Sequence, residues 1–365
     1  MRTSIHFVSI VTRRAHVRAQ LLDDHPPVDV QAVVAAVGGI QAQDIAAAAM
    51  SIRARCPGLA VADLTRAVWE ERCLVLTWSM RGTRHLHPAA DVRWLLRVFG
   101  PAFGRPGRRA EQLGIAGASG DRAVAALRDA LAAEGMLIRP QVKERLAAVG
   151  LDVSGQAPAH LLQRVALEGV LCVLPDPQGA SGQERYVLLD DWVPPSEVPS
   201  REEALALLAS RYRRAFGPAT VADFRAWSGL PAAQAELGWG AVTSGAGRPA
   251  EPGDAPAAPR RCPVRLTGGF DTLLLGYADR SLHLAPEHAR RVNAGGGLVR
   301  PVVLDDGGVV ATWRYLRGAT DTVEVIPFQA LSRRTLDGIE REVRDIGVFL
   351  GRDPHLELAE PASPS

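Results

Sequence analysis

The chain has 365 residues, of which 47% are hydrophobic, and a formal net charge of +2 at pH 7. This length allows about two to four small domains with a substantial buried core. The cysteines, Cys56, Cys73, Cys172 and Cys262, lack the paired spacing of a zinc site or a disulfide framework. No apolar run is long enough to cross a bilayer, and the first residues lack the apolar stretch of a signal peptide. We therefore expect a cytoplasmic protein with no membrane partner, whose thiols stay reduced.

Three stretches of the chain repeat one coarse pattern, in which helices precede a pair of strands. In the first stretch, helices are predicted at residues 13–22, 28–37, 45–55 and 61–71, and strands at 73–80 and 83–87. In the second, helices are predicted at 121–134, 139–149 and 158–168, and strands at 170–174 and 185–189. The third has helices at 201–215, 221–228 and 231–237 before the pattern ends. Helices followed by a two-stranded wing indicate a winged helix, a variant of the helix-turn-helix.

The last third of the chain favours strands over helices. After a Gly-, Ala- and Pro-rich loop or long wing at 243–259, strands are expected at 264–266, 272–277, 299–304, 309–315 and 323–328, with a hairpin turn at 305–308. An amphipathic helix is expected at 332–350, and a disordered end at 359–365. We therefore predict an α+β fold: three tandem winged-helix domains and a small C-terminal β-sheet or barrel, divided at 1–104, 105–198, 199–259, 260–352 and 353–365.

Two glutamines one residue apart, Gln41 and Gln43, lie between two predicted helices. Gly38 and Gly39 precede them and are natural helix-stopping residues, because glycine enters the left-handed backbone region without steric cost. Asp44 follows them and has the chemistry of an N-cap for the next helix. In an extended bridge, residues i and i+2 point to the same side, so both amides would face one place. The residues alone favour polar positions in solvent; the alternative is a pair of amides that orients a water and a polar substrate edge.

Five short motifs of the chain carry a family resemblance. They are Gly39-Ile40-Gln41-Ala42-Gln43-Asp44, Leu76-Thr77-Trp78-Ser79-Met80-Arg81-Gly82-Thr83-Arg84-His85-Leu86, Trp227-Ser228-Gly229-Leu230, Phe270-Asp271-Thr272-Leu273-Leu274-Leu275-Gly276-Tyr277-Ala278-Asp279-Arg280-Ser281 and Ala311-Thr312-Trp313-Arg314. In this order they resemble the winged-helix DNA-binding family of DNA glycosylases that contains AlkZ, over nearly the whole chain. The resemblance implies a C-shaped arrangement of the domains around a DNA channel. It also implies base excision from alkylated DNA, which in this family includes self-resistance to an alkylating antibiotic.

Gln41 and Gln43 match the catalytic Gln-X-Gln position of that family residue by residue. Alkylation at N7 makes guanine cationic and therefore a good leaving group, and its departure leaves an oxocarbenium-like sugar that a water can capture. Uncharged amides suit this work, because they position the water and surround the developing charge with oriented dipoles. A related branch of the family carries Asp at the second glutamine, so Asp44 is an alternative water-activating group.

Arg81, Thr83, His85 and His87 alternate along one predicted strand, so they would share a face. We expect at least one of them to contact a DNA phosphate or the lesion. The alternative is a half-exposed wing strand with its polar residues outward. A zinc site at the two histidines is not expected, because the sequence places no third ligand.

The hairpin around Gly307 is a second candidate for DNA contact. In the resembling glycosylases, a hairpin of the C-terminal β element approaches DNA and matters for unhooking crosslinks. Carried over to residues 302–314, this role makes Trp313 and Arg314 DNA-contacting residues.

Taken with these residues, the resemblance implies a monofunctional DNA glycosylase that hydrolyses the N-glycosidic bond of N7-alkylguanine, including bulky antibiotic adducts or interstrand crosslinks. Its partner would be double-stranded DNA with alkylated purines, and we expect a monomer that needs no metal and no cofactor. A lyase step is not expected, because Lys143 is the only lysine and lies far along the chain from the glutamines. Two alternatives are a winged-helix transcription regulator without catalytic activity and a catalytically silent relative that only binds damaged DNA. The near-neutral charge and three dissimilar modules without dimerisation heptads weigh against the regulator.

Overall fold

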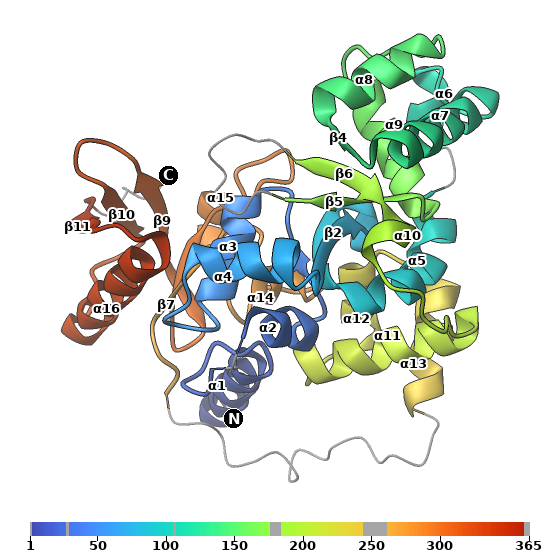
Figure 1. Ribbon diagram of the computed structural model, residues 1–365. Helices are drawn as coiled ribbons and strands as arrows, with labels where there is room; N and C mark the ends of the chain where they lie inside the picture. The colour runs from blue at the N-terminus through green and yellow to red at the C-terminus, as the bar shows by residue number, and fades with distance from the viewer. Residues whose placement is uncertain (1, 27–28, 105–106, 176–183, 244–260, 361–365) are drawn as a thin grey trace.

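The computed structural model describes residues 2–26, 29–104, 107–175, 184–243 and 261–360, and it confirms a mixed α+β fold with two sheets. The C-terminal sheet and its helix (red in Figure 1) lie at one end of the molecule, and helices from the second stretch (green) lie at the other. The first stretch (blue) lies between them. No helix in the described ranges has both the length and the apolar character needed to cross a membrane.

The first stretch forms the predicted helices and strand pair. Helix α1 (Arg2–Ala19) begins well before the predicted residue 13, whereas α2 (Val30–Ala36) and α3 (Ile45–Arg53) lie close to the predicted positions. Helix α4 (Val61–Thr65) continues into a π-helical turn, Arg66–Glu70. The antiparallel strands are β2 (Leu74–Trp78) and β3 (Arg84–Pro88), and a short strand, β1 (Ile40–Gln41), pairs with the other edge of β3.

The strands of the first two stretches form one continuous sheet. The second stretch supplies β4 (Met136–Ile138), β5 (Leu171–Leu174) and β6 (Arg185–Leu188), and the strand order is β1-β3-β2-β5-β6-β4. Strands β2 and β5 meet where Leu76 pairs with Val173, and every residue of both strands is buried. The strand pairs expected as two separate wings are therefore joined edge to edge. The glutamine segment lies at one edge of the resulting sheet, in β1.

Helices of the second and third stretches cover this sheet. The second stretch and the region before it contain α5 (Ala89–Phe103), α6 (Arg108–Gln112), α7 (Ala118–Glu134), α8 (Arg139–Ala148), α9 (Ala157–Leu167) and α10 (Leu189–Trp192). The third stretch contains α11 (Arg201–Phe216), α12 (Val221–Ser228) and α13 (Ala232–Thr243), and no strand in its described residues. Residues 244–260, which carry most of the expected loop or wing, lie outside the described ranges.

The C-terminal sheet has the order β11-β10-β9-β8-β7. Its strands are β7 (Arg265–Thr267), β8 (Val302–Asp305), β9 (Gly308–Leu316), β10 (Thr322–Pro327) and β11 (His355–Leu358). Strands β7 and β11 lie at opposite edges, so the described sheet is open and not a closed barrel. The pairing is antiparallel except between β10 and β11, which are parallel.

One sequence prediction for this region is wrong. The strand predicted at 272–277 is a short helix, α14 (Thr272–Leu275), because the Asp271 carboxylate caps it by accepting a hydrogen bond from Leu273 N (3.0 Å). Strand β11 ends just before the predicted disordered end at 359–365, of which residues 361–365 lie outside the described ranges. The other helices of this region are α15 (Ala289–Val292) and α16 (Arg333–Leu350), and the second of these matches the predicted closing helix.

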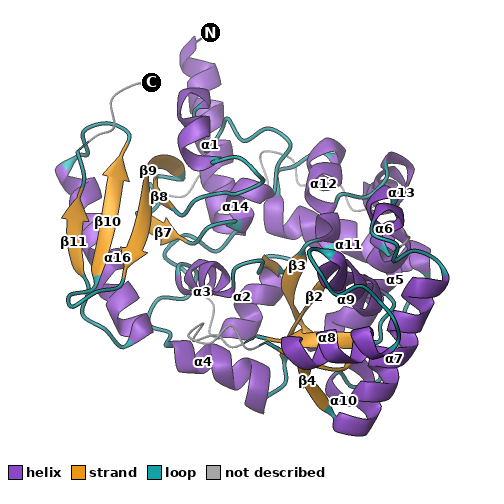
Figure 2. Cartoon of the chain, turned by 90° about the horizontal axis from the view of Figure 1, so that it is seen from above, coloured by secondary structure: helices purple, strands orange, loops and turns teal. Residues whose placement is uncertain are grey.

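Helix α3 connects the two halves of the molecule, and Figures 1 and 2 both place it between the two sheets. Two fully buried arginines fix it there. Arg53 binds the carboxylate of Glu342 on α16 (Nη2 to Oε2, 2.8 Å), and Arg55 binds both carboxylate oxygens of Asp271 (2.8 and 2.9 Å). Because α3 starts directly after the glutamine segment, these ion pairs also hold that segment against the C-terminal half.

Candidate active site

The glutamine segment is a short extended bridge, as the sequence predicts. Gly38 and Gly39 end α2 with positive φ values of 77° and 97°. A Cβ atom at Gly39 would also collide with the imidazole of His87, because it would lie 2.4 Å from a ring carbon. The next two residues form β1, in which Gln41 pairs with His85 of β3. Glycine is therefore required at position 39 both for its backbone conformation and for space.

Gln41 is held inside this bridge with a defined orientation. Its side chain is 7% exposed, and its Oε1 atom accepts a hydrogen bond from Arg81 Nη2 at 2.6 Å. Arg81 Nη1 donates to the backbone carbonyl of Trp227 at the end of α12. A guanidinium can only donate hydrogen bonds, so its partner must be the oxygen of the amide and not the NH₂ group. The NH₂ group of Gln41 is therefore directed away from Arg81.

Arg81 itself lies in a strained and largely desolvated position. It belongs to the 3₁₀ turn Met80–Gly82 with φ at 54°, and a Cβ atom at Gly229 would lie 2.9 Å from its Cα. Burial, with the charge of Arg280 as a second cause, lowers its pKa to about 10, so it stays protonated at neutral pH. Neither Arg81 nor Arg280 forms an ion pair with a carboxylate of the described residues. Arg81, which binds Gln41, and Arg280, whose charge acts on Arg81, thus lack a counter-charge within the described chain.

Gln43 differs from Gln41 because its side chain is exposed. Its Oε1 atom accepts only a long hydrogen bond from Arg84 N (3.4 Å). The Arg84 side chain donates to the Gln43 carbonyl (3.2 Å) and forms an ion pair with Glu184, which comes from the second stretch. Gln43 also lines an open hollow of about 520 Å³ between β3 and α9. One glutamine is therefore fixed in the interior, while the other is accessible to solvent.

Asp44 acts as the N-cap of α3, which confirms that part of the sequence interpretation. Its Oδ1 atom accepts hydrogen bonds from Ala46 N (2.9 Å) and Ala47 N (3.1 Å). The cap engages Oδ1 and leaves Oδ2 without a hydrogen bond to a described residue. The water-activating alternative for Asp44 therefore stays a prediction.

The expected shared face of four polar residues is not formed. Strand β3 begins at Arg84, so Arg81 and Thr83 precede it, because the positive φ of Arg81 turns the chain before the strand starts. His85 and His87 do lie on the strand, but they are only 2% and 1% exposed. In this structure they are enclosed side chains without open access to DNA. Thr83 is half-buried, and its hydroxyl donates to the carbonyl of Met80 (3.0 Å).

Burial also sets the protonation of the two histidines. It lowers the pKa of His87 to about 4 and that of His85 well below its ordinary value of 6.5. His87 Nε2 lies 2.8 Å from Ser79 Oγ, and His85 Nδ1 lies 3.0 Å from the carbonyl of Thr83. Both rings are therefore neutral and structurally engaged at neutral pH. Within the described ranges, no cluster of His, Cys, Asp and Glu side chains has the arrangement of a metal site.

The structure places Trp313 and Arg314 in the C-terminal sheet, in different environments. Trp313 is 4% exposed, and its Nε1 atom donates to the carbonyl of Thr267 (2.9 Å), so it packs in the core. Arg314 is exposed and forms an ion pair with Glu324 on the neighbouring strand β10. Direct contact with DNA is thus open to Arg314 but not to Trp313 in this conformation.

The tip of the same hairpin is held against α1. Arg14 donates to both carboxylate oxygens of Asp306 (2.8 and 2.9 Å), and Arg13 Nε donates to the Asp306 carbonyl (2.9 Å). A Cβ atom at Gly307 would lie 2.5 Å from a methyl group of Val17. The tip is therefore packed against the N-terminal helix, and it is not a free projection.

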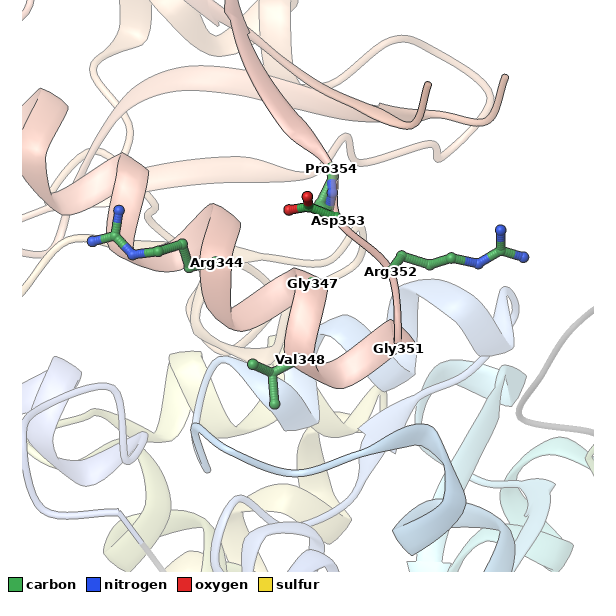
Figure 3. Close-up of a pocket in the computed structure, with 7 residues that line it drawn as sticks. All are labelled: Arg344, Gly347, Val348, Gly351, Arg352, Asp353 and Pro354. Atoms are coloured by element: carbon green, nitrogen blue, oxygen red, sulfur yellow. The ribbon is translucent and has the colours of Figure 1, made fainter. Parts of the chain in front are cut away.

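A second hollow, of about 570 Å³, lies at the end of α16 (Figure 3). The guanidinium groups of Arg344 and Arg352 point away from one another there, so the hollow has no convergent polar groups. No predicted site residue contributes to it. Its lining consists of Arg344, Gly347, Val348, Gly351, Arg352, Asp353 and Pro354.

Sequence reasoning assigned no role to Arg84, Glu184 or Arg280, all of which lie close to the glutamines or to Arg81. Strand alternation placed Arg84 on the face opposite His85, and Glu184 follows a stretch whose fold the sequence did not specify. Arg280 belongs to one of the five motifs, and that membership was the sequence signal for it.

Comparison with known proteins identifies the family of the chain. A family model described as DNA glycosylase AlkZ-like matches residues 34–349. An interstrand DNA cross-link repair glycosylase from Streptomyces sahachiroi is 27% identical over 364 residues, which cover 90% of this chain and 92% of that protein. The solved structure of Streptomyces sahachiroi DNA glycosylase AlkZ superposes with a TM-score of 0.78 at 24% identity, covering 96% of this chain and 99% of that one. The family resemblance seen in the sequence is confirmed: the chain belongs to the AlkZ-like family of DNA glycosylases.

Proposed function

We propose that this DNA glycosylase acts as a monofunctional monomer on double-stranded DNA and hydrolyses the N-glycosidic bond of N7-alkylguanine. We include bulky adducts and interstrand crosslinks among its substrates, because a relative that matches most of the chain is named for crosslink repair. One observation carries the proposal: the amides of Gln41 and Gln43 lie one residue apart, and the imidazoles closest to them in the sheet are buried and neutral. Such a site suits a leaving group that needs no protonation.

In this mechanism, Gln43 holds the attacking water. Its Oε1 atom has a lone pair beyond the long bond to Arg84 N, and its NH₂ group is exposed, so the amide can both accept from and donate to one water. Gln41, fixed by Arg81, presents its NH₂ group as an oriented donor that holds an oxygen of the DNA beside the reacting sugar. The C1′–N9 bond breaks with its electron pair going to the cationic base, which leaves as a neutral molecule; the water then bonds to C1′ of the oxocarbenium-like sugar and releases its extra proton to solvent. Positioning and oriented dipoles then lower the barrier without a strong base.

DNA would be bound mainly through arginine. Arg81 and Arg280 lack carboxylate partners among the described residues, so a DNA phosphate is a suitable counter-charge for them. Thr83 and Arg314 remain candidates for further contacts, whereas His85, His87 and Trp313 support the site from the interior. We also propose that the three helix-rich stretches act as winged-helix modules around a DNA-sized concavity.

The decisive experiment uses duplex DNA with a single N7-methylguanine. The expected result is free N7-methylguanine and an equal amount of abasic sites. Release by the wild type but not by a Gln41→Ala/Gln43→Ala double variant would support the assignment, whereas undiminished release by that variant would overturn it. Binding selection on random duplexes addresses the regulator alternative, because a glycosylase that scans DNA should show no sharp consensus sequence and a strong loss of affinity with salt.

A further inference from the structure

The hollow beside Gln43 carries one positive charge that no carboxylate of the described residues balances. It has a volume of about 520 Å³ and lies where the second stretch approaches β2 and β3 of the first. Three charged side chains line it: those of Arg84, Glu184 and Arg139. Arg84 and Glu184 form an ion pair, so their charges cancel. Arg139 therefore gives the hollow its net charge.

Arg139 is the first residue of α8, and its side chain is exposed. It forms no hydrogen bond and no ion pair with a described residue. Its charge still reaches into the hollow: burial raises the pKa of Tyr186 to about 12, Glu184 adds to the rise, and Arg139 opposes it. A guanidinium without a partner presents a planar fork of donors, which suits two oxygens of one phosphate group.

His160 adds a second donor from the next helix, α9, and it lines the same hollow. The side chain is half-buried and makes no hydrogen bond to a described residue. A neutral imidazole can donate one hydrogen bond, so it needs no charge to contribute. Two consecutive helices thus bring a free guanidinium and a free imidazole to one hollow, and an anion with several acceptor oxygens fits this pair of donors.

The wall of the hollow also positions Gln43. Arg84 donates from its backbone N to Gln43 Oε1 (3.4 Å) and from its side chain to the Gln43 carbonyl (3.2 Å). Through its ion pair, Arg84 is joined to Glu184, whose other carboxylate oxygen accepts from the Tyr186 hydroxyl (3.2 Å). An anion bound in the hollow is therefore held in a defined relation to the Gln43 amide.

We propose that Arg139 and His160 form a subsite for one backbone phosphate of the DNA strand that carries the lesion. The proposal rests on the proposed function, because Gln43 must lie at the reacting sugar for a phosphate in the same hollow to belong to the same strand. Phosphate contacts of this kind fix the register of a protein on DNA and carry no sequence information. Arg139 and His160 are thus positioning residues, which hold the strand while the glutamines act on the sugar.

The first test measures how salt weakens binding to undamaged duplexes of two unrelated sequences. Arg139→Gln removes the charge, and Arg139→Lys keeps it. Arg128→Gln is the matched control, since Arg128 is an exposed arginine of α7 that does not line the hollow. Arg139→Gln should weaken binding about threefold or more on both sequences, and the slope of log affinity against log salt should fall by about 1. Arg139→Lys should largely restore the slope, and Arg128→Gln should not change it.

The second test identifies the phosphate. Duplexes with one N7-methylguanine carry a single neutral methylphosphonate at successive positions of the lesion strand, and base release is measured at limiting enzyme. At one position the substitution should slow the wild type about threefold or more and should cost Arg139→Gln almost nothing, because the contact is already lost. At all other positions the two proteins should respond alike. His160→Ala should be insensitive at the same position.

An unchanged salt slope in Arg139→Gln would overturn the inference. So would a loss of affinity that depends on sequence, which would mean contact with a base edge, or equal responses of the wild type and Arg139→Gln at every methylphosphonate position. Absence of base release by the wild type would refute the proposed function. The salt dependence on undamaged DNA does not require catalysis, so it would still decide whether Arg139 binds a phosphate.

Discussion

Arg81 Nη2 donates a hydrogen bond to Gln41 Oε1 at 2.6 Å, across the end of the β1–β3 strand pair. A side-chain amide can rotate by half a turn, which exchanges the positions of its oxygen and its NH₂ group with little change in shape. A guanidinium prevents this exchange, because it has no acceptor for the NH₂ group. Arg81 therefore fixes which end of Gln41 faces the proposed water and sugar, and its second bond, to the Trp227 carbonyl, fixes Arg81 in turn.

The first prediction concerns this pair. Arg81→Met should lower base release by about tenfold or more, because Gln41 loses the bond that orients it. In a Gln41→Ala background, the same change should cost much less, since no amide remains to be oriented. A double-mutant cycle of single-turnover rates measures this coupling. Equal effects of Arg81→Met in both backgrounds would mean that Arg81 acts on DNA alone.

The second prediction concerns the two glutamines separately. Gln41→Ala and Gln43→Ala should each reduce base release by about 10²–10³-fold, the usual loss for one oriented donor at a polar site. Affinity for undamaged duplex DNA should change little. Gln31→Ala, at an exposed position of α2, is the matched control and should keep wild-type activity. Wild-type rates for both site variants would redirect attention to Asp44.

The sequence was sufficient to predict the local elements around the glutamines. Helix-stopping glycines, the Asp44 cap and the two-stranded pattern that follows each have a short-range physical cause, and all are present. The features of the site that the sequence did not reveal depend on long-range contacts. The ion pair between Arg84 and Glu184 joins residues 100 positions apart, and no local pattern reports it.

The differences between the expected and the observed structure have a similar origin. His85 and His87 alternate with apolar residues as an exposed polar face would, yet the sheet is covered on both sides and buries them. The apolar run after Asp271 reads as a strand, but the cap and the buried pairing of Asp271 with Arg55 favour a helical turn. In both cases tertiary packing decides between two conformations that the local residues permit.

The third prediction concerns lyase chemistry. Borohydride trapping with DNA that contains an abasic site should yield no covalent complex, because a Schiff base needs an amine and Lys143 lies on the exposed surface of α8. Gel electrophoresis under denaturing conditions detects such a complex. A trapped species that disappears in Lys143→Arg would show that α8 reaches the abasic site, contrary to the proposed geometry.

The fourth prediction concerns stability against acid. The pKa of His87 is about 4 in the folded protein and about 6.5 when exposed, so between these values the unfolded chain binds more protons. Stability is therefore fully present above about pH 6.5 and falls as the pH drops towards 4. From pH 7 to pH 5, His87 alone should account for a loss of roughly 2 kcal/mol in the free energy of unfolding.

Denaturant titrations at the two pH values measure this loss. His85 shifts in the same direction and should add to it. His87→Asn, which removes one titrating group, should flatten the dependence even if it lowers stability overall. A midpoint that stays constant between pH 7 and pH 5 in the wild type would contradict the buried, neutral state of these histidines.

The fifth prediction concerns the charge of the lesion and the pH dependence of its release. Cationic lesions such as N7-alkylguanine and N3-alkyladenine should leave much faster than neutral ones such as uracil, because expelling a neutral base requires protonation or stabilisation of an anion. Glutamine does neither well. The rate should also change little between about pH 6 and 8, since the amides do not titrate and the lowered pKa values of His85 and His87 keep both rings neutral throughout this interval. Single-turnover release across a lesion panel and a pH series measures both effects. Rapid excision of uracil would contradict the amide mechanism, and a steep profile centred near the ordinary histidine pKa would require an imidazole that becomes exposed when DNA binds.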